Sequence, residues 1–184
     1  ARLLCTGLLI AAVGACDPEA DVTDSTRPST LGSTPTVTTS TTPPAAGTGI
    51  PAGDDRIVER VVDGDTLKLT DATRVRLIGV DTPETVDPRK PVQCFGKEAS
   101  AYVAGLLPAG TPVRLVYDVQ RLDRYGRTLA YVYRLPDGLF VNARLAAEGY
   151  ASPLTIPPDV AHADLFAGLA AAAREARKGL WGAC

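Results

Sequence analysis

The 184-residue sequence has one His and four Cys, so it offers little of the imidazole and thiolate chemistry on which zinc sites depend. It also lacks a net basic charge: the formal net charge at pH 7 is −2, and residues 54–184 carry 17 basic and 17 acidic side chains. A protein that clamps phosphate groups usually has an excess of Lys and Arg. Any phosphate site must therefore be a local cluster of cations and not the result of an overall positive field.

The apolar run Leu3–Val13 is too short to cross a bilayer. It follows Arg2 and ends in small residues, which is typical of an export signal. Val13-Gly14-Ala15-Cys16 resembles the lipobox of bacterial lipoproteins and predicts a signal segment over residues 1–16, with a lipid on Cys16 that anchors the protein to the membrane. The alternative is an ordinary cleaved secretory peptide in which Cys16 falls at this position by chance.

Residues 17–53 are dominated by Thr, Ser, Pro and Gly, which predicts a disordered linker because such a stretch buries too little apolar surface to fold. Residues 54–184 have the size of a single domain.

Within this domain, five short segments have the β-branched or alternating composition of strands, with Leu67 and Leu69 pointing inward. These segments are Arg56–Val62, Asp65–Leu69, Arg74–Val80, Pro112–Asp118 and Thr128–Arg134. Helical periodicity appears in Lys97–Leu107, in Asn142–Glu148 with Asn142 as a candidate cap, and in Asp159–Arg177, which Gly179 closes. The single histidine, His162, is expected to be a surface or capping residue. This inventory is that of a five-stranded OB-type barrel, although other small α+β folds share it.

Three clusters combine residues of catalytic type: Asp63-Gly64-Asp65-Thr66, the segment Arg76–Glu84, and Asp123-Arg124-Tyr125-Gly126-Arg127. Taken singly, each has an ordinary structural explanation as a hairpin turn, a strand terminator or a solvated loop. Together they supply oxygen donors, which favour a hard cation such as calcium, and two arginines, which are the usual fork donors to a phosphate.

These clusters resemble, in order and spacing, the three signature segments of the staphylococcal nuclease family. The resemblance runs from about Arg56 to Trp181 and includes the Gly96-Lys97-Glu98-Ala99-Ser100 helix start. It implies an α+β fold, an OB-fold barrel of five strands with three helices. It also implies calcium as the cofactor, DNA and RNA as substrates, and hydrolysis of their phosphodiester bonds to products that end in a 3′-phosphate.

Carried over by motif position, the resemblance implies three kinds of site residue. Asp65, Asp81 and the Thr82 carbonyl are expected to hold calcium, Glu84 to orient or deprotonate the attacking water, and Arg76 and Arg127 to bind phosphate. Arg124 and Tyr125 are expected to contact the substrate strand. The sequence departs from the family at Ser152–Pro158, which has no aromatic ring where the best-known member has two tyrosines, so base stacking there is in doubt.

Cysteine usage predicts one disulfide. Cys5 leaves with the signal and Cys16 carries the lipid, so Cys94 and Cys184 remain as a pair in an oxidising compartment. Two free thiols are the alternative. No pattern of an oligomer is visible, and we expect a monomer on the extracellular side of the bacterial membrane or in secreted form.

Two non-catalytic functions compete with the nuclease. One is an OB-fold module on a surface lipoprotein that binds nucleic acid without cleaving it, and the other is a calcium-stabilised structural lipoprotein. Degenerate binding copies typically lose the acid–base carboxylate or an arginine, whereas this chain keeps Glu84, Arg76 and Arg127.

Overall fold

The structure is a computed structural model of the whole chain, and it describes residues 49–87, 91–135 and 137–184. The expected signal segment 1–16 with its Cys16, and residues 17–48 of the expected linker, lie outside the described residues. Ile50, from the end of the expected linker, packs against the hydrophobic core, so the folded domain includes this residue. In the described part of the chain, none of the helices has the length and hydropathy of a membrane span.

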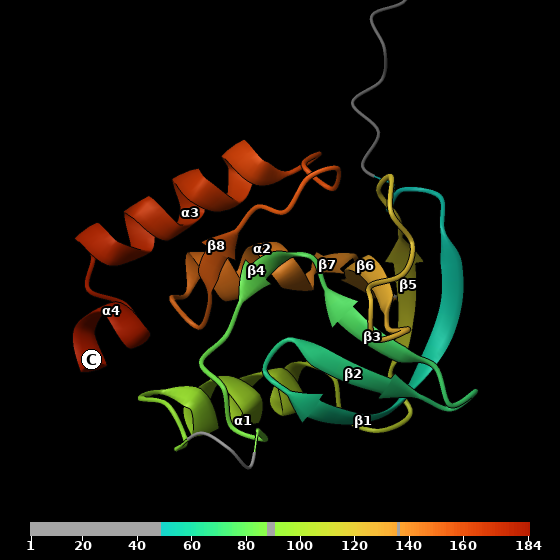
Figure 1. Cartoon of the computed structure of the whole chain (residues 1–184), viewed down its shortest axis with the longest axis horizontal. Coiled ribbons are helices and arrows are strands. Elements are labelled where there is room, and N and C mark those ends of the chain that lie inside the picture. The colour runs from blue at the N-terminus through green and yellow to red at the C-terminus, as the bar shows by residue number, and fades with distance from the viewer. Residues whose placement is uncertain (1–48, 88–90, 136) are drawn as a thin grey trace, which may run out of the picture. The chain divides into compact units, whose positions relative to one another are not determined.

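Five strands form a closed barrel (Figure 1). They are β1 (Asp54–Asp63), β2 (Thr66–Leu69), β3 (Arg74–Leu77), β5 (Pro112–Val116) and β6 (Thr128–Arg134). β1 pairs antiparallel with β2 and with β5, β2 with β3, and β5 with β6. A parallel pairing of β3 with β6 closes the sheet on itself. This topology is that of the OB-fold barrel, which confirms the predicted fold class.

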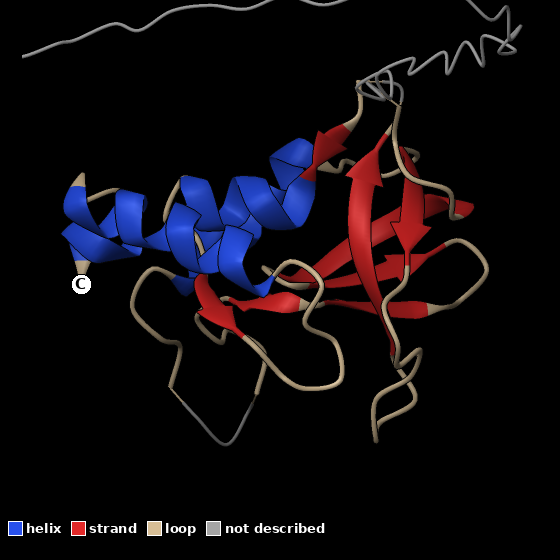
Figure 2. Cartoon of the chain, turned by 90° about the horizontal axis from the view of Figure 1, so that it is seen from above, coloured by secondary structure: helices blue, strands red, loops and turns tan. Residues whose placement is uncertain are grey.

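The helices gather on one side of the barrel (Figure 2). They are α1 (Gly96–Leu106), α2 (Val141–Ala147), α3 (Ala163–Glu175) and the short α4 (Leu180–Ala183). Three further short strands complete the described elements: β4 (Gly79–Asp81) pairs antiparallel with β8 (Ser152–Leu154), and β7 (Leu139–Phe140) lies beside β6. The three predicted helices are therefore present, and α4 is an addition to them.

The core fills the barrel and the space under the helices. Leu67 and Leu69 of β2 are fully buried, as their alternation with polar residues predicts. Val75 and Leu77 of β3 occupy the same interior, and Phe166 of α3 seals it from the helical side. β2, β3 and β5 each place two apolar side chains in the core on either side of a partly exposed residue, whereas β6 buries four consecutive residues, Ala130–Tyr133.

The predicted third strand, Arg74–Val80, is in fact two strands, because the chain leaves the barrel at Ile78. Gly79 adopts a left-handed backbone with φ +80°, and a Cβ at this position would overlap the Phe166 ring. Asn142 was predicted as a helix cap, and this prediction is wrong: its buried side chain accepts a hydrogen bond from Val132 N at 2.9 Å and donates one to Ile78 O at 2.8 Å. The Asn142 amide thus satisfies backbone groups at the point where β3 ends.

The last long helix is shorter than the predicted span Asp159–Arg177. Asp159 instead lies in the preceding loop, where its buried carboxylate accepts a hydrogen bond from Gln120 N at 2.7 Å. His162 occupies the N-cap position of α3 without a side-chain cap hydrogen bond, and its ring packs edge-on against Tyr131. Tertiary contacts of the residues ahead of α3 therefore override the helical periodicity seen in the sequence.

A disulfide joins Cys94, two residues ahead of α1, to Cys184 after α4, across a sequence separation of 90 residues. It fixes the carboxy-terminal end to the loop that follows Glu84. The loop and the last turn of the chain are thereby covalently linked.

Candidate active site

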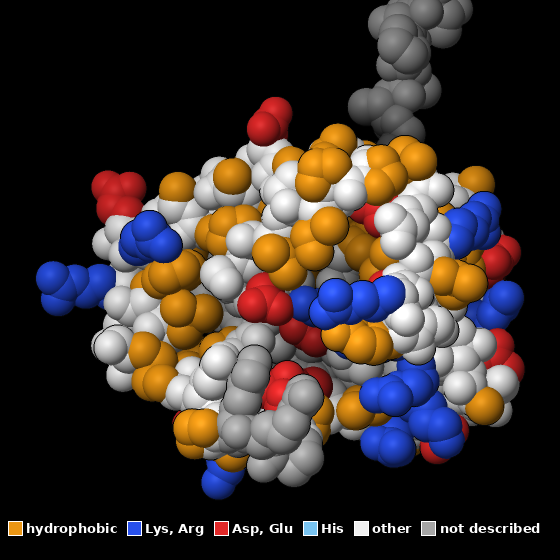
Figure 3. Space-filling view, viewed as in Figure 1, with side chains coloured by type: hydrophobic (Ala, Val, Ile, Leu, Met, Phe, Trp, Pro, Cys, Tyr) orange, Lys and Arg blue, Asp and Glu red, His pale blue; other side chains and the backbone are white. Residues whose placement is uncertain are grey.

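The six residues expected to carry catalysis and metal binding all line one pocket of about 310 Å³. They are Arg76, Glu84, Arg127, Asp65, Asp81 and Thr82. Asp65 lies in the turn between β1 and β2, and Arg76 lies in β3. Asp81 is the last residue of β4, Thr82 and Glu84 follow it, and Arg127 directly precedes β6. Figure 3 shows acidic and basic side chains side by side on this face of the molecule. The parallel pairing of β3 with β6 brings the second and third segments together, so segments distant in the sequence share one pocket.

Arg76 lies between two carboxylates. Its guanidinium contacts Asp65 Oδ2 and Asp81 Oδ1, each at 2.7 Å, and also donates to the carbonyl oxygens of Leu77 and Val80 at 3.1 Å. Only 13% of the Arg76 side chain is exposed, so these charges interact in a partly dehydrated environment. Arg76 thus holds the end of β3 and neutralises the two acidic groups.

Asp65 is buried at the turn between β1 and β2. Burial raises the pKa of its carboxyl group, although the Arg76 guanidinium and the Thr82 N–H act in the opposite direction. Thr82 donates to Asp65 Oδ2 from both its backbone N–H and its hydroxyl, each at 3.1 Å. This approach requires Gly64, because a Cβ there would lie 2.7 Å from Thr82 Oγ1. Gly64 of the first motif therefore allows the hairpin turn to pack closely against Thr82.

Glu84 folds over its own loop. One carboxylate oxygen accepts hydrogen bonds from the backbone N–H groups of Thr85 at 2.9 Å, Val86 at 2.7 Å and Asp87 at 3.1 Å. The Glu84 N–H in turn donates to Gln93 Oε1 at 2.9 Å. These bonds fix the carboxylate at the pocket wall, so Glu84 has a structural role in addition to any role in proton transfer.

Arg127 is positioned by Asp123, a residue of the third motif for which the sequence predicted no role in the site. The Asp123 carboxylate accepts from Arg127 Nε at 2.6 Å and from the backbone N–H groups of Tyr125 and Arg127 at 2.8 and 2.9 Å. Burial alone raises the pKa of Asp123, but the hydrogen bonds from Arg127 and Tyr125 outweigh it and hold that pKa below its ordinary value. The sequence did contain a signal for this ion pair, because Asp123 lies four positions ahead of Arg127.

Asp63 is a second positioning residue that the sequence did not reveal. Its buried carboxylate accepts from Gly64 N at 2.9 Å, from Thr85 Oγ1 at 2.7 Å and from Ser100 Oγ at 3.0 Å. It therefore ties the turn after β1 to the Glu84 loop and to α1. Nothing in an Asp-Gly turn pair predicts these partners, because they lie far along the chain.

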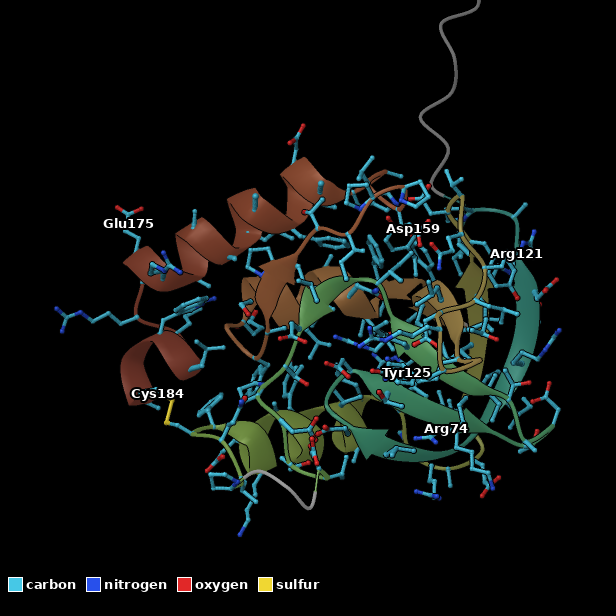
Figure 4. The ribbon with its side chains drawn as sticks, in the orientation of Figure 1. Arg74, Arg121, Tyr125, Asp159, Glu175 and Cys184 are labelled. Atoms are coloured by element: carbon cyan, nitrogen blue, oxygen red, sulfur yellow. A yellow bond between two sulfur atoms is a disulfide. The ribbon has the colours of Figure 1, made fainter. Side chains whose placement is uncertain are left out.

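Arg124 and Tyr125 lie at the rim of the site, where Figure 4 labels Tyr125. Tyr125 is 68% exposed, and its hydroxyl accepts a hydrogen bond from Arg124 at 2.6 Å. The guanidinium groups of Arg124 and Arg127 lie 4.8 and 5.5 Å from the Tyr125 ring centre. The arrangement leaves an aromatic surface beside two cations and open to solvent.

A second pocket of about 540 Å³ adjoins the first and shares Arg76 and Arg127 with it. Half of its other lining residues are aliphatic, including Leu154 and Ile156 from the segment that has no aromatic ring, and Arg124 and Tyr125 line it as well. An apolar hollow thus opens directly beside the two arginines.

The donor set of the first pocket fits a hard cation. Asp65, Asp81 and the Thr82 carbonyl offer oxygen atoms only, and one guanidinium already bridges the two carboxylates, which shows that both can face a single positive charge. Among the described residues, no group of three or more His, Cys, Asp or Glu side chains forms a metal site. Such a donor set suits a weak site completed by water and substrate, not a tight site made of protein ligands alone.

Comparison with known proteins supports the resemblance. Residues 74–183 match the family model described as staphylococcal nuclease homologue. The chain is 51% identical over 110 residues to the thermonuclease of Staphylococcus intermedius, which covers 58% of this chain and 64% of that protein. It is 44% identical over 127 residues to the thermonuclease of Staphylococcus hyicus, covering 67% of this chain and 73% of that protein. A prophage-derived endonuclease of Bacillus subtilis, YokF, is 36% identical over 132 residues, which are 69% of this chain and 44% of that protein.

Proposed function

The chain belongs to the staphylococcal nuclease family, and from this membership we propose that it is a calcium-dependent nuclease that hydrolyses phosphodiester bonds of DNA and RNA to products ending in a 3′-phosphate. One observation carries the proposal. Six residues from three separate segments, with the two arginines, the carboxylate base and the hard-cation donors all present, line a single pocket. A module that only binds nucleic acid has no need for this combination.

Arg76 and Arg127 are the proposed phosphate ligands. A guanidinium presents planar, paired N–H donors that match two phosphate oxygens, and its charge offsets the negative charge that builds up in the transition state. Asp123 holds Arg127 from its Nε side, which leaves the terminal nitrogens of Arg127 available to a ligand. With substrate and metal bound, Arg76 would exchange its contacts with Asp65 and Asp81 for contacts with the phosphate.

Glu84 is the proposed base. It accepts a proton from a water molecule, the oxygen of that water forms a bond to phosphorus, and the bond from phosphorus to the 5′-oxygen breaks. The leaving 5′-oxygen takes a proton from solvent and becomes a hydroxyl group, Glu84 returns its proton to solvent, and the phosphate stays on the 3′-oxygen of the other product. The three backbone donors to Glu84 keep the carboxylate in one place between turnovers.

Asp65, Asp81 and the Thr82 carbonyl would hold the calcium ion. When bound, it supplies positive charge next to the phosphate oxygens. Two carboxylates place the expected dissociation constant in the range of roughly 10⁻⁴–10⁻³ M that is typical of extracellular calcium modules.

The aliphatic pocket beside the arginines is the proposed site for the base of the bound nucleotide. Leu154 and Ile156 offer apolar contact but no ring, while Tyr125 and Arg124 contact the strand at the rim. Stacking on an aromatic ring contributes about 1–3 kcal/mol per base. Relative to a family member with tyrosines in this segment, we expect the missing rings to raise the KM more than they lower the turnover number.

The proposed location is the outer side of the bacterial membrane, reached through the signal segment and held there by a lipid on Cys16, or the medium after release. The Cys94–Cys184 disulfide supports an oxidising compartment. We propose that the enzyme acts there as a monomer.

A cleavage assay tests the proposed function. The purified domain is incubated with plasmid DNA, single-stranded DNA and RNA in millimolar calcium, and each reaction is repeated in excess chelator. Loss of substrate in calcium but not in chelator, with 3′-phosphate ends on the products, is expected. Binding of all three polymers without cleavage would establish the non-catalytic module instead.

A further inference from the structure

Three basic side chains form a row across neighbouring strands. Arg60 of β1 pairs in register with Lys68 of β2, and Lys68 pairs in register with Arg74 of β3. Residues directly opposite each other in paired strands point to the same face of a sheet. Leu67 and Leu69 on either side of Lys68 are buried inside the barrel, so the row, named here the cationic row (Arg60, Lys68 and Arg74), lies on its outer face.

The cationic row ends at the candidate active site. In the parallel pairing of β3 with β6, Val75 is opposite Thr128, so Arg74 and Arg127 precede paired positions on adjacent strands. Both side chains line the 310 Å³ pocket. Figure 4 labels Arg74 on the same side of the barrel as Tyr125, and Figure 3 shows basic side chains clustered at that position. The row is therefore continuous with a proposed phosphate ligand.

The cationic row has fewer acidic partners per cation than Arg114 and Arg134, two other arginines of the barrel strands. Arg114 makes two bonds to Asp55, and Arg134 makes two to Asp137. In the row, by contrast, Lys68 and Arg60 share one oxygen of Glu59, at 2.8 and 3.9 Å, and within the described residues Arg74 has no ion pair. Three cations against one carboxylate produce a local positive field in a domain whose total charge is balanced.

We propose that the cationic row binds backbone phosphates of a single-stranded polynucleotide on one side of the bond that is cleaved. This inference rests on the proposed function, because it extends the same site. Four neighbouring strands at a spacing of about 4.8 Å place Arg60 roughly 14 Å from Arg127, which is far enough for more than one phosphate to bind. Continuity with Arg127 favours nucleic acid over an anionic lipid surface as the occupant.

The test is the salt dependence of binding. A labelled deoxythymidylate 12-mer and a dinucleotide are titrated with the protein in chelator, at several salt concentrations, and binding is followed by fluorescence anisotropy. The parent is compared with the triple variant Arg60→Gln, Lys68→Gln and Arg74→Gln. A matched control, Lys97→Gln, Arg144→Gln and Arg177→Gln, removes three exposed cations from outside the row. Circular dichroism establishes that both variants are folded.

Each phosphate contact on a single strand contributes about 0.7 to the slope of log K against log salt concentration. The triple variant is therefore expected to lower the 12-mer slope by about 2 and the dinucleotide slope by at most about 0.7, because only Arg74 of the row lines the pocket. The control is expected to match the parent. An unchanged 12-mer slope, or an equal decrease in the control, would overturn the inference. So would a variant that loses binding to anionic lipid vesicles but keeps its affinity for the 12-mer.

Cleavage by the parent separates this inference from the proposed function. If the parent cleaves in calcium but the triple variant has the same salt slope as the parent, the proposed function stands and the role of the cationic row is refuted. A parent that never cleaves while the slope falls by about 2 refutes the nuclease and retains the row as part of a binding module.

Discussion

Replacing each phosphate-binding arginine by lysine separates two roles that the structure assigns differently. Arg76 makes four contacts, to Asp65, Asp81 and two backbone carbonyls, whereas the Arg127 guanidinium has one carboxylate partner among the described residues, Asp123. Lysine keeps the charge but has one nitrogen in place of the planar fork. Arg76→Lys therefore loses at least one charge-assisted hydrogen bond at a mostly buried position, and Arg127→Lys keeps its ion pair.

A hydrogen bond from a charged donor contributes about 1.5–3 kcal/mol, so Arg76→Lys is expected to lower the free energy of unfolding by about 2–4 kcal/mol. The same change at Arg127 is expected to cost under about 1 kcal/mol, because the lysine keeps the charge that pairs with Asp123. Both variants are expected to lower kcat by roughly 10²–10³, the usual effect of removing one transition-state donor. Urea denaturation in chelator measures the first quantity, and single-turnover cleavage at saturating calcium measures the second.

Equal stabilities for the two lysine variants would refute the structural role given to Arg76. Cleavage rates within about twofold of the parent for both variants would refute bidentate phosphate binding and leave only a general electrostatic field. A large loss of activity at Arg127 without loss of stability is the combination that the structure supports.

Three further outcomes are expected. Calcium titration of cleavage should give half-maximal activity at roughly 10⁻⁴–10⁻³ M, and full activity in chelator would contradict the assigned donors. Asp65→Asn removes one of two ligand carboxylates, so the apparent calcium affinity should fall and part of the lost activity should return at higher calcium; a loss that calcium does not recover would point to a structural role. Replacing Cys94 and Cys184 by Ser opens a loop of about 90 residues, so the free energy of unfolding should fall by up to about 4–5 kcal/mol while kcat is unchanged. Equal midpoints of thermal unfolding for the oxidised parent and the variant would contradict this.

The sequence predicted the barrel because local chemistry and tertiary structure agree there. Leu67 and Leu69 alternate with polar residues in β2, and β6 has the limits expected from its composition, Thr128–Arg134. Prediction from the sequence failed where contacts between residues far apart in the chain determine the structure. Asn142 has the residue type of a helix cap, but its amide hydrogen-bonds backbone groups of Val132 and Ile78. Asp159 accepts a hydrogen bond from Gln120 N and does not begin a helix.

The candidate site shows the same division. Motif order placed Arg76, Glu84 and Arg127 in one set, and these residues do share a pocket. The residues that position them were missed, because Asp63 reaches its partners only after the chain has folded and because the bonds of Asp123 depend on the turn at Gly126. The three backbone donors to Glu84 are likewise a property of the folded loop and not of any motif.

Glu84 decides between a nuclease and a module that only binds nucleic acid. Glu84→Gln preserves the size of the side chain, and its amide oxygen can still accept the hydrogen bonds that hold the loop, but it no longer accepts a proton. Cleavage of single-stranded DNA at saturating calcium is measured for the parent and this variant, together with calcium affinity. A fall in kcat of roughly 10²–10⁴ with little change in calcium affinity is predicted, and a rate within about twofold of the parent would contradict catalysis by this site.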